Sequence, residues 1–258
     1  MRTFQRDTPQ FVEGFRAQSS TSSCVKCISK SACLNSNLDI DRRERLTTEY
    51  THQFKVKVGD AIFHQGDPIQ SIYNVSTGFL KLEFSLSNGQ HQVTRFASNG
   101  DLVGLDGIAD GRHHLDAYAL TDGVICSLNY VRLQSLIQKE PMIQKSIERA
   151  LSNELNRAQE HLFSLGSHSV EEKLVYFILE LLQKEGRFKS EQNYLHLPMN
   201  RGDLKSYLGI TVESLSRALA TLEGAKFFRV KNREINEIDY HKLVEFLDLT
   251  LEESGQTI

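Results

Sequence analysis

The glycines of this chain are unevenly spread, and their spacing constrains the fold more than any other feature. Nine of the sixteen glycines fall between Gly59 and Gly123, where they separate short segments such as FKVKV, SIYNV, FLKLEFSL and HQVTRFA. Alternating apolar and β-branched residues with turns at this spacing predict an all-β roll or sandwich over residues 54–128. Asn88-Gly89 predicts a type I′ hairpin turn between two of these strands.

A long helix is predicted after this glycine-rich region. A short helical segment ends near Lys139, and Pro141 suits the first turn of the next helix. Leucine and alanine recur with 4-3-4-3 spacing along residues 141–168, which is the apolar seam of a coiled coil. The seam residues are Leu151, Leu155, Ala158, Leu162 and Leu165, and Ile147 lies one turn before them. This spacing predicts a homodimer, although a single helix packed on its own domain has the same pattern.

The C-terminal part has the element order of a winged helix-turn-helix. VEEKLVYFILELLQKEG, residues 170–186, is a strongly apolar helix. RGDLKSYLG and TVESLSRALATLEGAKF then form two short helices around a glycine turn, and FFRVKNREINEI follows as a basic β-hairpin. Because the second helix of such motifs lies in the major groove, residues 169–258 are predicted to bind double-stranded DNA.

The second of these short helices carries a polar face suited to base recognition. Thr211 can cap the helix, and Glu213, Ser216 and Arg217 lie at i, i+3 and i+4 on one side of it. Arginine can donate two hydrogen bonds to guanine, glutamate can accept one from cytosine, and serine suits several base edges. An exposed ion pair between Glu213 and Arg217 is the alternative interpretation of the same spacing.

Charge changes sign along the chain. The whole sequence has a formal net charge of −3, but residues 187–233 contain nine Lys/Arg against four Asp/Glu. Lys231 and Arg233 on the predicted hairpin are therefore expected to contact DNA phosphates. No segment approaches the roughly 18 apolar residues of a membrane span, and the N-terminus lacks an apolar signal sequence, so a cytoplasmic location without membrane contact is predicted.

Four cysteines suggest a metal or cluster site. Cys24, Cys27 and Cys33 have Cys-x₂-Cys-x₅-Cys spacing, and Cys126 is remote, near the end of the predicted roll. An iron–sulfur cluster needs four converging thiolates, often three from one loop and one from elsewhere. A structural zinc ion on the same four thiolates, or a redox-active thiol site, remains open from the spacing alone.

These motifs together resemble one family of regulators. RGDLKSYLGITVESLSRALATLE resembles the recognition unit of the CRP–FNR family, and its Glu-x-x-Ser-Arg triplet resembles that of the FNR (fumarate and nitrate reduction) branch. The resemblance covers nearly the whole chain. It implies an α+β fold with a cyclic-nucleotide-binding-like β-roll, a long dimerisation helix and a C-terminal winged helix-turn-helix. The expected boundaries are an arm at 1–37, a roll at 38–140, the helix at 141–168 and the DNA-binding domain at 169–258.

The resemblance also implies how the regulator works. It implies an oxygen-labile 4Fe–4S cluster on Cys24, Cys27, Cys33 and Cys126 that promotes dimerisation. It further implies a palindromic site with TTGAT-like half-sites, RNA polymerase as a partner, and both activation and repression of transcription. An enzyme is not expected, because no phosphate-binding glycine loop, zinc protease motif or nucleophile turn is present.

Two departures from family patterns are visible. Cyclic-nucleotide-binding rolls carry a Glu for the ribose and an Arg for the phosphate, whereas this sequence has Leu105 and Leu115-Asp116 at the equivalent places. An aspartate facing a phosphate is repulsive, so no cyclic nucleotide is expected. In addition, Ala158 stands where the FNR branch can carry an acidic residue that opposes dimerisation without the cluster.

Overall fold

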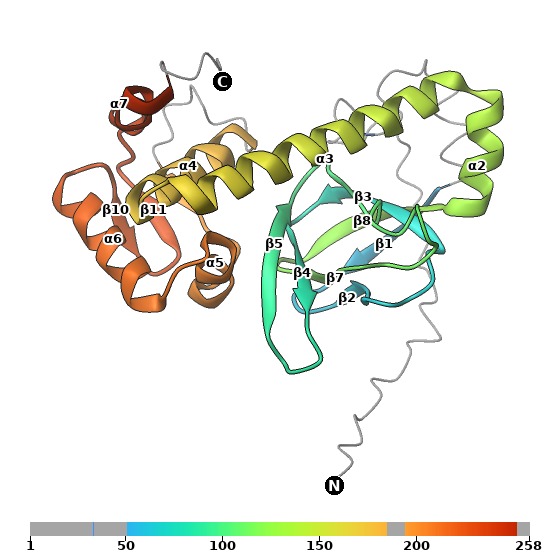
Figure 1. The fold of residues 1–258 in the computed structure, drawn as a ribbon, viewed down its shortest axis with the longest axis horizontal. Helices are drawn as coiled ribbons and strands as arrows, with labels where there is room; N and C mark the ends of the chain where they lie inside the picture. Colours follow the sequence, from blue (N-terminus) through green and yellow to red (C-terminus); the bar gives the residue numbers. More distant parts are fainter. Residues whose placement is uncertain (1–32, 34–50, 185–193, 252–258) are drawn as a thin grey trace, which may run out of the picture.

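A β-roll forms the N-terminal half of the computed structural model, which describes residues 33, 51–184 and 194–251. Its strands are β1 (Thr51–Val56), β2 (Ala61–Phe63), β3 (Ser71–Thr77), β4 (Leu80–Ser85), β5 (His91–Ala97), β6 (Leu102–Val103), β7 (Asp116–Ala119) and β8 (Gly123–Asn129). They make two four-stranded sheets, in the orders β1-β8-β3-β6 and β2-β7-β4-β5 (Figure 1). All strand pairings within both sheets are antiparallel.

The β4–β5 hairpin lies where the sequence predicts it, but its turn is of another type. Gly89 N donates to Leu86 O at 3.0 Å, and Leu86 N donates to Gln90 O at 2.8 Å. Only Gly89 has a positive φ, +86°, whereas a type I′ turn needs positive φ at both central residues. Asn88 Oδ1 instead accepts a hydrogen bond from Gln90 N at 3.0 Å. The type I′ prediction is therefore wrong, and the loop matches a type I turn followed by a left-handed glycine.

Two separate apolar clusters hold the roll together. One fills the space between the sheets and includes Val75, Leu82 and Ile125. The other covers the outer face of the β1-β8-β3-β6 sheet, where Ile72 and Leu128 pack with residues of the two following helices. The roll is thus tied directly to the helix that follows it.

Helices α2 (Tyr130–Lys139) and α3 (Pro141–Ser167) follow as predicted, with Pro141 in the first turn of α3. At 27 residues, α3 is about 40 Å long, and it runs from the roll to the C-terminal domain (Figure 1). None of the helices in the described part of the chain is long and apolar enough to cross a membrane.

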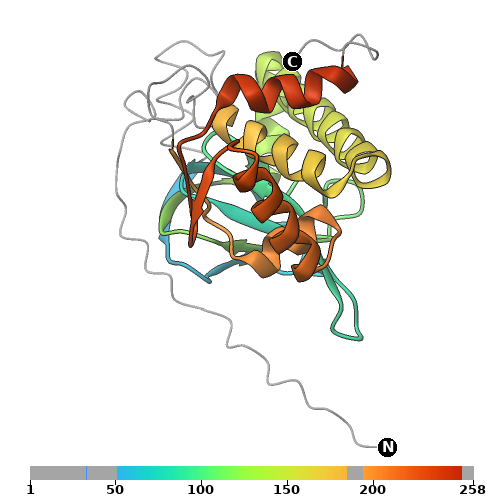
Figure 2. The ribbon, with the colours of Figure 1, turned by 90° about the vertical axis from the view of Figure 1, so that its left-hand side faces the viewer.

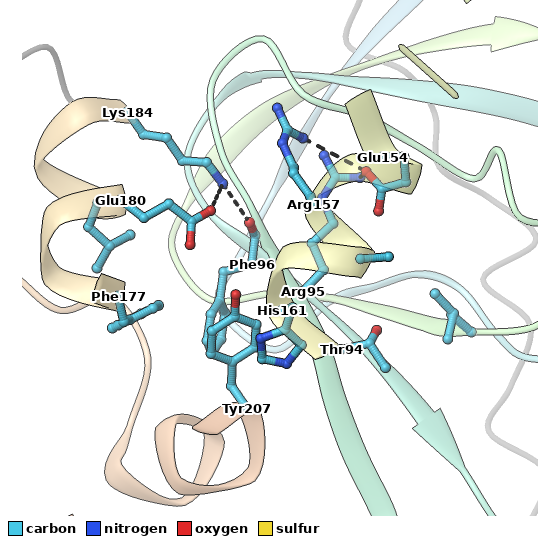
Figure 3. Close-up of a pocket in the computed structure, with 13 residues that line it drawn as sticks. Thr94, Arg95, Phe96, Glu154, Arg157, His161, Phe177, Glu180, Lys184 and Tyr207 are labelled. Atoms are coloured by element: carbon cyan, nitrogen blue, oxygen red, sulfur yellow. Dashed lines mark hydrogen bonds and ion pairs between the residues drawn. The ribbon is translucent and has the colours of Figure 1, made fainter. Parts of the chain in front are cut away.

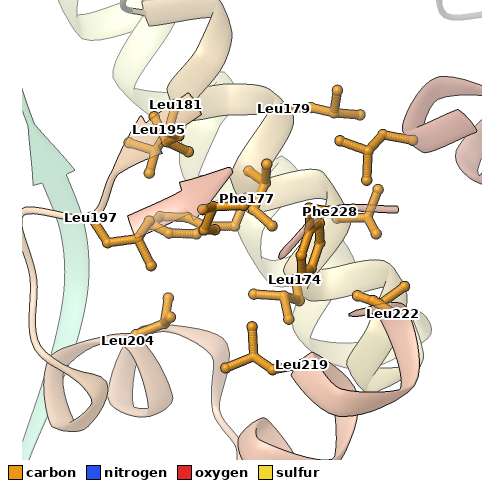
Figure 4. Packing of buried hydrophobic residues seen from close by; sticks show 14 of the residues in the cluster. Leu174, Phe177, Leu179, Leu181, Leu195, Leu197, Leu204, Leu219, Leu222 and Phe228 are labelled. Carbon is orange, nitrogen blue, oxygen red and sulfur yellow. The ribbon is translucent and has the colours of Figure 1, made fainter. Parts of the chain in front are cut away.

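The C-terminal domain is a winged helix-turn-helix. Its elements are α4 (Val170–Lys184), β9 (Tyr194–His196), α5 (Arg201–Leu208), α6 (Val212–Gly224), β10 (Arg229–Lys231), β11 (Glu234–Asn236) and α7 (Tyr240–Leu251). Leu174 and Phe177 of α4 pack near Leu219 and Leu222 of α6, and Phe228 closes the same core (Figure 4). The predicted fold class is confirmed.

Two elements of this domain are not in the sequence prediction. β9 pairs with β11 and completes a three-stranded sheet, and α7 packs against α4. β9 has only three residues within a polar stretch, so it lacks a periodic signal of its own. Figure 2 shows the orange helices of the C-terminal domain in front of the roll, α7 above them and the β4–β5 hairpin extending below.

Candidate DNA-reading surface and cysteine site

The start of α6 is fixed by two local features. Gly209 ends α5 in the left-handed conformation, with φ +64°, and so makes the tight turn of the helix-turn-helix. Thr211 then caps α6, because its side chain accepts a hydrogen bond from Ser214 N at 3.1 Å. The predicted cap is confirmed, and it orients the first turn of the helix.

The polar face of α6 is exposed in full. Glu213, Ser216 and Arg217 are all exposed, while the opposite face is buried through Leu215 and Leu219. Glu213 and Arg217, both described, do not form the alternative ion pair. The Arg217 guanidinium is instead directed to Ser214, with Nη2 3.5 Å from Ser214 Oγ. Backbone and Thr211 hydrogen bonds lower the pKa of Glu213, which keeps its carboxylate ready to accept hydrogen bonds.

The wing adds positive charge beside this helix. β10 and β11 pair as Lys231↔Glu234, and Asn232 makes the turn with φ +58°. Lys231 and Arg233 are exposed at the tip of this hairpin. They are available for contacts with phosphate groups, which would hold the protein on DNA without reading its sequence.

The cysteines are described only in part. Cys24 and Cys27 lie outside the described residues, and Cys33 is half-buried. Cys126 is 5% exposed in the middle of β8, where it pairs with Gln53 of β1 and Asn74 of β3. No group of three or more metal-binding side chains lies among the described residues, and the four-cysteine site, which includes Cys24 and Cys27, stays a prediction.

The candidate dimer seam on α3 divides into three groups. Leu151, Leu155 and Leu162 are exposed, with exposed fractions of 41%, 60% and 68%. Ile147 is buried under the helix in the outer-sheet cluster, and Leu165 is half-buried toward the C-terminal domain. Ala158 is exposed and also lines a cavity between α3, β5 and α4.

Each half of the chain matches a known domain family. Residues 53–140 match the cyclic nucleotide-binding domain, and residues 172–246 match the Crp-like helix-turn-helix domain. The regulatory protein HlyX of Actinobacillus pleuropneumoniae is 33% identical over 84% of this chain and 91% of its own length. The chain belongs to the CRP–FNR family.

Other members support the same placement. The fumarate and nitrate reduction regulatory protein of Vibrio cholerae is 29% identical over 89% of this chain and 92% of its own. The structure of FixK2 from Bradyrhizobium japonicum is 26% identical, covers 76% of this chain and 96% of its own, and superposes with a TM-score of 0.68. This CRP–FNR protein is a DNA-binding transcription regulator of the FNR type, and the prediction that it is not an enzyme is confirmed.

Side-chain hydrogen bonds hold the segment around β6 and β7 of this CRP–FNR protein. Leu105 is buried in the outer-sheet cluster. The Asp116 carboxylate accepts hydrogen bonds from Gln65 N at 3.0 Å and Ser85 Oγ at 2.8 Å. Asp106 accepts from His114 N at 2.7 Å and from the next backbone N–H at 3.1 Å. Both carboxylates are thus engaged in hydrogen bonds within the roll.

Proposed function

We propose that this regulator senses oxygen through a 4Fe–4S cluster held by Cys24, Cys27, Cys33 and Cys126. With the cluster intact, it binds as a homodimer to a palindrome of TTGAT-like half-sites and acts with RNA polymerase to activate or repress transcription. The N-terminal arm would be residues 1–37, the roll 38–140, the dimerisation helix 141–168 and the DNA-binding domain 169–258. The cytoplasm, where its DNA lies, is the proposed location.

The position of Cys126 carries this proposal. Ile125 faces the interior of the roll, so Cys126 faces outward, because neighbouring residues in a strand point to opposite sides. Leu128 lies on the same outer face as Cys126 and packs with Ile143 and Ile147 of α3. A ligand at Cys126 therefore lies on the sheet face that supports the dimerisation helix.

The donor set fits an iron–sulfur cluster. Four thiolates are the usual ligands of a 4Fe–4S cluster, which when bound would supply an oxygen-sensitive link between the arm and β8. Burial of Cys126 shields that thiolate from solvent. The partners of Cys126 on the two neighbouring strands are also buried, Asn74 at 1% and Gln53 at 9% exposed. Polar amides therefore border the thiol on both sides.

DNA recognition rests on the exposed face of α6. Arg217 and Glu213 suit a G·C pair in the major groove, and Ser216 suits a neighbouring thymine. We also propose that no cyclic nucleotide binds, because the Asp106 and Asp116 carboxylates already accept the hydrogen bonds described above.

Anaerobic purification with iron, sulfide and zinc analysis tests the cluster. The wild-type protein should contain about four irons and four sulfides per chain and should lose its colour in air. Cys126→Ala should lose the cluster as fully as Cys24→Ala, because three thiolates leave one iron without a protein ligand. Ser127→Ala, at the next position of β8 and on the opposite face, is the matched control and should keep it. Stoichiometric zinc without sulfide would contradict the proposed oxygen-sensing cluster and indicate a structural zinc site on the same cysteines.

A further inference from the structure

The DNA-binding domain is attached to the edge of the sensor roll. β5 is the outermost strand of its sheet, so some of its backbone groups have no neighbouring strand to bind. Val93 N donates to Ser206 Oγ of α5 at 2.9 Å. The Gln92 side-chain amide donates to the Ser206 carbonyl oxygen. α5 thus covers part of an edge that would otherwise face solvent.

An ion pair joins α5 to β4, the strand next to β5 in the sheet. Lys81 Nζ lies 2.9 Å from Asp203 Oδ1 of α5 and 2.8 Å from Glu83 Oε2 on its own strand. The side chains of Lys81 and Asp203 are only 18% and 8% exposed. Water screens such a pair far less than it screens a surface pair. Separating the domains would leave the buried Asp203 carboxylate without Lys81, whereas Lys81 would keep Glu83 on its own strand.

A second set of charges gathers at Asp101, in the turn between β5 and β6. Its carboxylate lies 3.1 Å from Arg95 Nη2 of β5, 3.0 Å from Arg157 Nη1 of α3 and 3.7 Å from Lys184 Nζ of α4. Lys184 also donates to the carbonyl oxygen of Phe96 at 3.2 Å. One carboxylate therefore contacts the sensor, the dimerisation helix and the DNA-binding domain together.

Aromatic contacts complete the junction. The His161 ring of α3 stacks on Tyr207 of α5 with centroids 4.1 Å apart, and Phe96 of β5 lies 5.1 Å from Tyr207 and 5.7 Å from Phe177. Figure 3 shows these rings grouped together, with Lys184 reaching the Phe96 carbonyl above them. A cavity of about 250 Å³ remains between α3, β5 and α4, with Tyr207 of α5 in its lining.

We propose that Lys81, Asp101 and Asp203 are positioning residues that fix the angle between α6 and α3 and thereby set the half-site spacing that the dimer prefers. The inference rests on the proposed dimer. Only residues 168–169 join α3 to α4, and two residues alone leave the domain free to turn. In a dimer joined along α3, that angle decides how far apart the two copies of α6 lie, and one helical turn of DNA, about 34 Å, is required.

Spacing preference is the decisive measurement. Anaerobically prepared wild type, Asp101→Asn, Lys81→Met and the double variant Lys81→Met/Asp203→Asn are titrated with three kinds of duplex. These carry a single half-site, the palindrome, and the palindrome with one or two base pairs added between its halves. Asp122→Asn is the matched control, because Asp122 pairs with Lys57 at 3.4 Å on the exposed surface of the same roll.

The wild type and the control should prefer the native spacing by about tenfold or more. Asp101→Asn and Lys81→Met should lose most of this preference while their affinity for a single half-site changes less than about twofold. In the double variant, Asp203→Asn removes the carboxylate charge that Lys81→Met alone would leave unpaired. It therefore tests the loss of the Lys81–Asp203 contact if Lys81→Met fails to fold. Its spacing preference should be lost too.

Variants that keep the wild-type spacing ratio, or that weaken all duplexes equally, would overturn the positioning role and leave the proposed function intact. A wild type that binds the palindrome no more tightly than a single half-site would overturn both, since no dimer would then be reading the palindrome.

Discussion

Arg157 Nη1 of α3 donates a hydrogen bond to Asp101 Oδ1 at 3.0 Å, which links the β-roll to the middle of α3. Burial alone would raise the pKa of Asp101, but Arg95, Lys184 and Arg157 together lower it below the ordinary value of an aspartate. The carboxylate therefore stays ionised and keeps its three partners under mildly acidic conditions.

This pKa shift predicts a pH dependence of stability. The unfolded chain takes up the Asp101 proton near the ordinary pKa of about 3.9, at a higher pH than the folded chain does. The stabilisation from Asp101 should be complete above about pH 5 and be lost as the pH falls toward the lowered folded-state pKa. Urea unfolding of the apo protein should show a wild-type advantage over Asp101→Asn that shrinks as the pH falls below 4. A constant difference at all pH values would contradict the shift.

Arg217 and the wing should have different effects on DNA binding. Arg217→Ala should cost about 1–3 kcal/mol on the cognate half-site and relax the preference at its G·C pair. Lys231→Ala or Arg233→Ala should weaken cognate and scrambled DNA alike and lower the slope of log affinity against log salt by about one. Fluorescence anisotropy at several salt concentrations measures both effects. Equal losses on cognate and scrambled DNA for Arg217→Ala would exclude a base-reading role.

The exposed leucines of α3 should control dimerisation. No described seam position carries a charge, so apo protein should retain measurable dimer at micromolar concentration. Leu162→Asp, at a position 68% exposed in the single chain, should shift it to monomer. Ala158→Asp should do so less strongly, because Arg95 and Arg157 line the same cavity and offset the repulsion.

Sedimentation equilibrium of apo and cluster-loaded forms measures this association. Asn156→Asp is the control, since Asn156 is exposed on another side of α3 and should leave the dimer unchanged. A monomeric apo wild type, or a Leu162→Asp variant that associates normally, would show that this seam does not set the oligomeric state.

Gly209 should be intolerant of a side chain. Its φ of +64° disfavours alanine, and an added Cβ would lie 2.9 Å from Leu165 Cδ2 of α3. Gly209→Ala should therefore lower the free energy of unfolding by about 1–3 kcal/mol. Gly166→Ala is the matched control: the site is helical, and an added Cβ would meet no atom within 4 Å apart from the nearby backbone of its own helix, so stability should stay the same or rise by about 0.5–1 kcal/mol. Thermal unfolding of both variants measures the contrast.

Local patterns in the sequence were sufficient for most of the individual elements. Turn spacing predicted the roll, apolar periodicity predicted α3 and α4, and Gly209 with Thr211 predicted the turn and cap of the recognition helix. These features depend on backbone conformation and on residues within one or two turns of each other, so the order of residues determines them. The three-residue β9 escaped prediction because its stability comes from pairing with β11, which is distant in the chain.

Only the tertiary structure decided which charges meet. Lys81 and Asp203 are more than a hundred residues apart, and Asp101, Arg157 and Lys184 come from a turn and two helices that are distant in the sequence. The same holds for α3, where one apolar repeat supplies Ile147 to the roll core and Leu155 to the exposed face. Residue type and spacing set which face of a helix is apolar, whereas the surrounding packing determines which part of that face is covered.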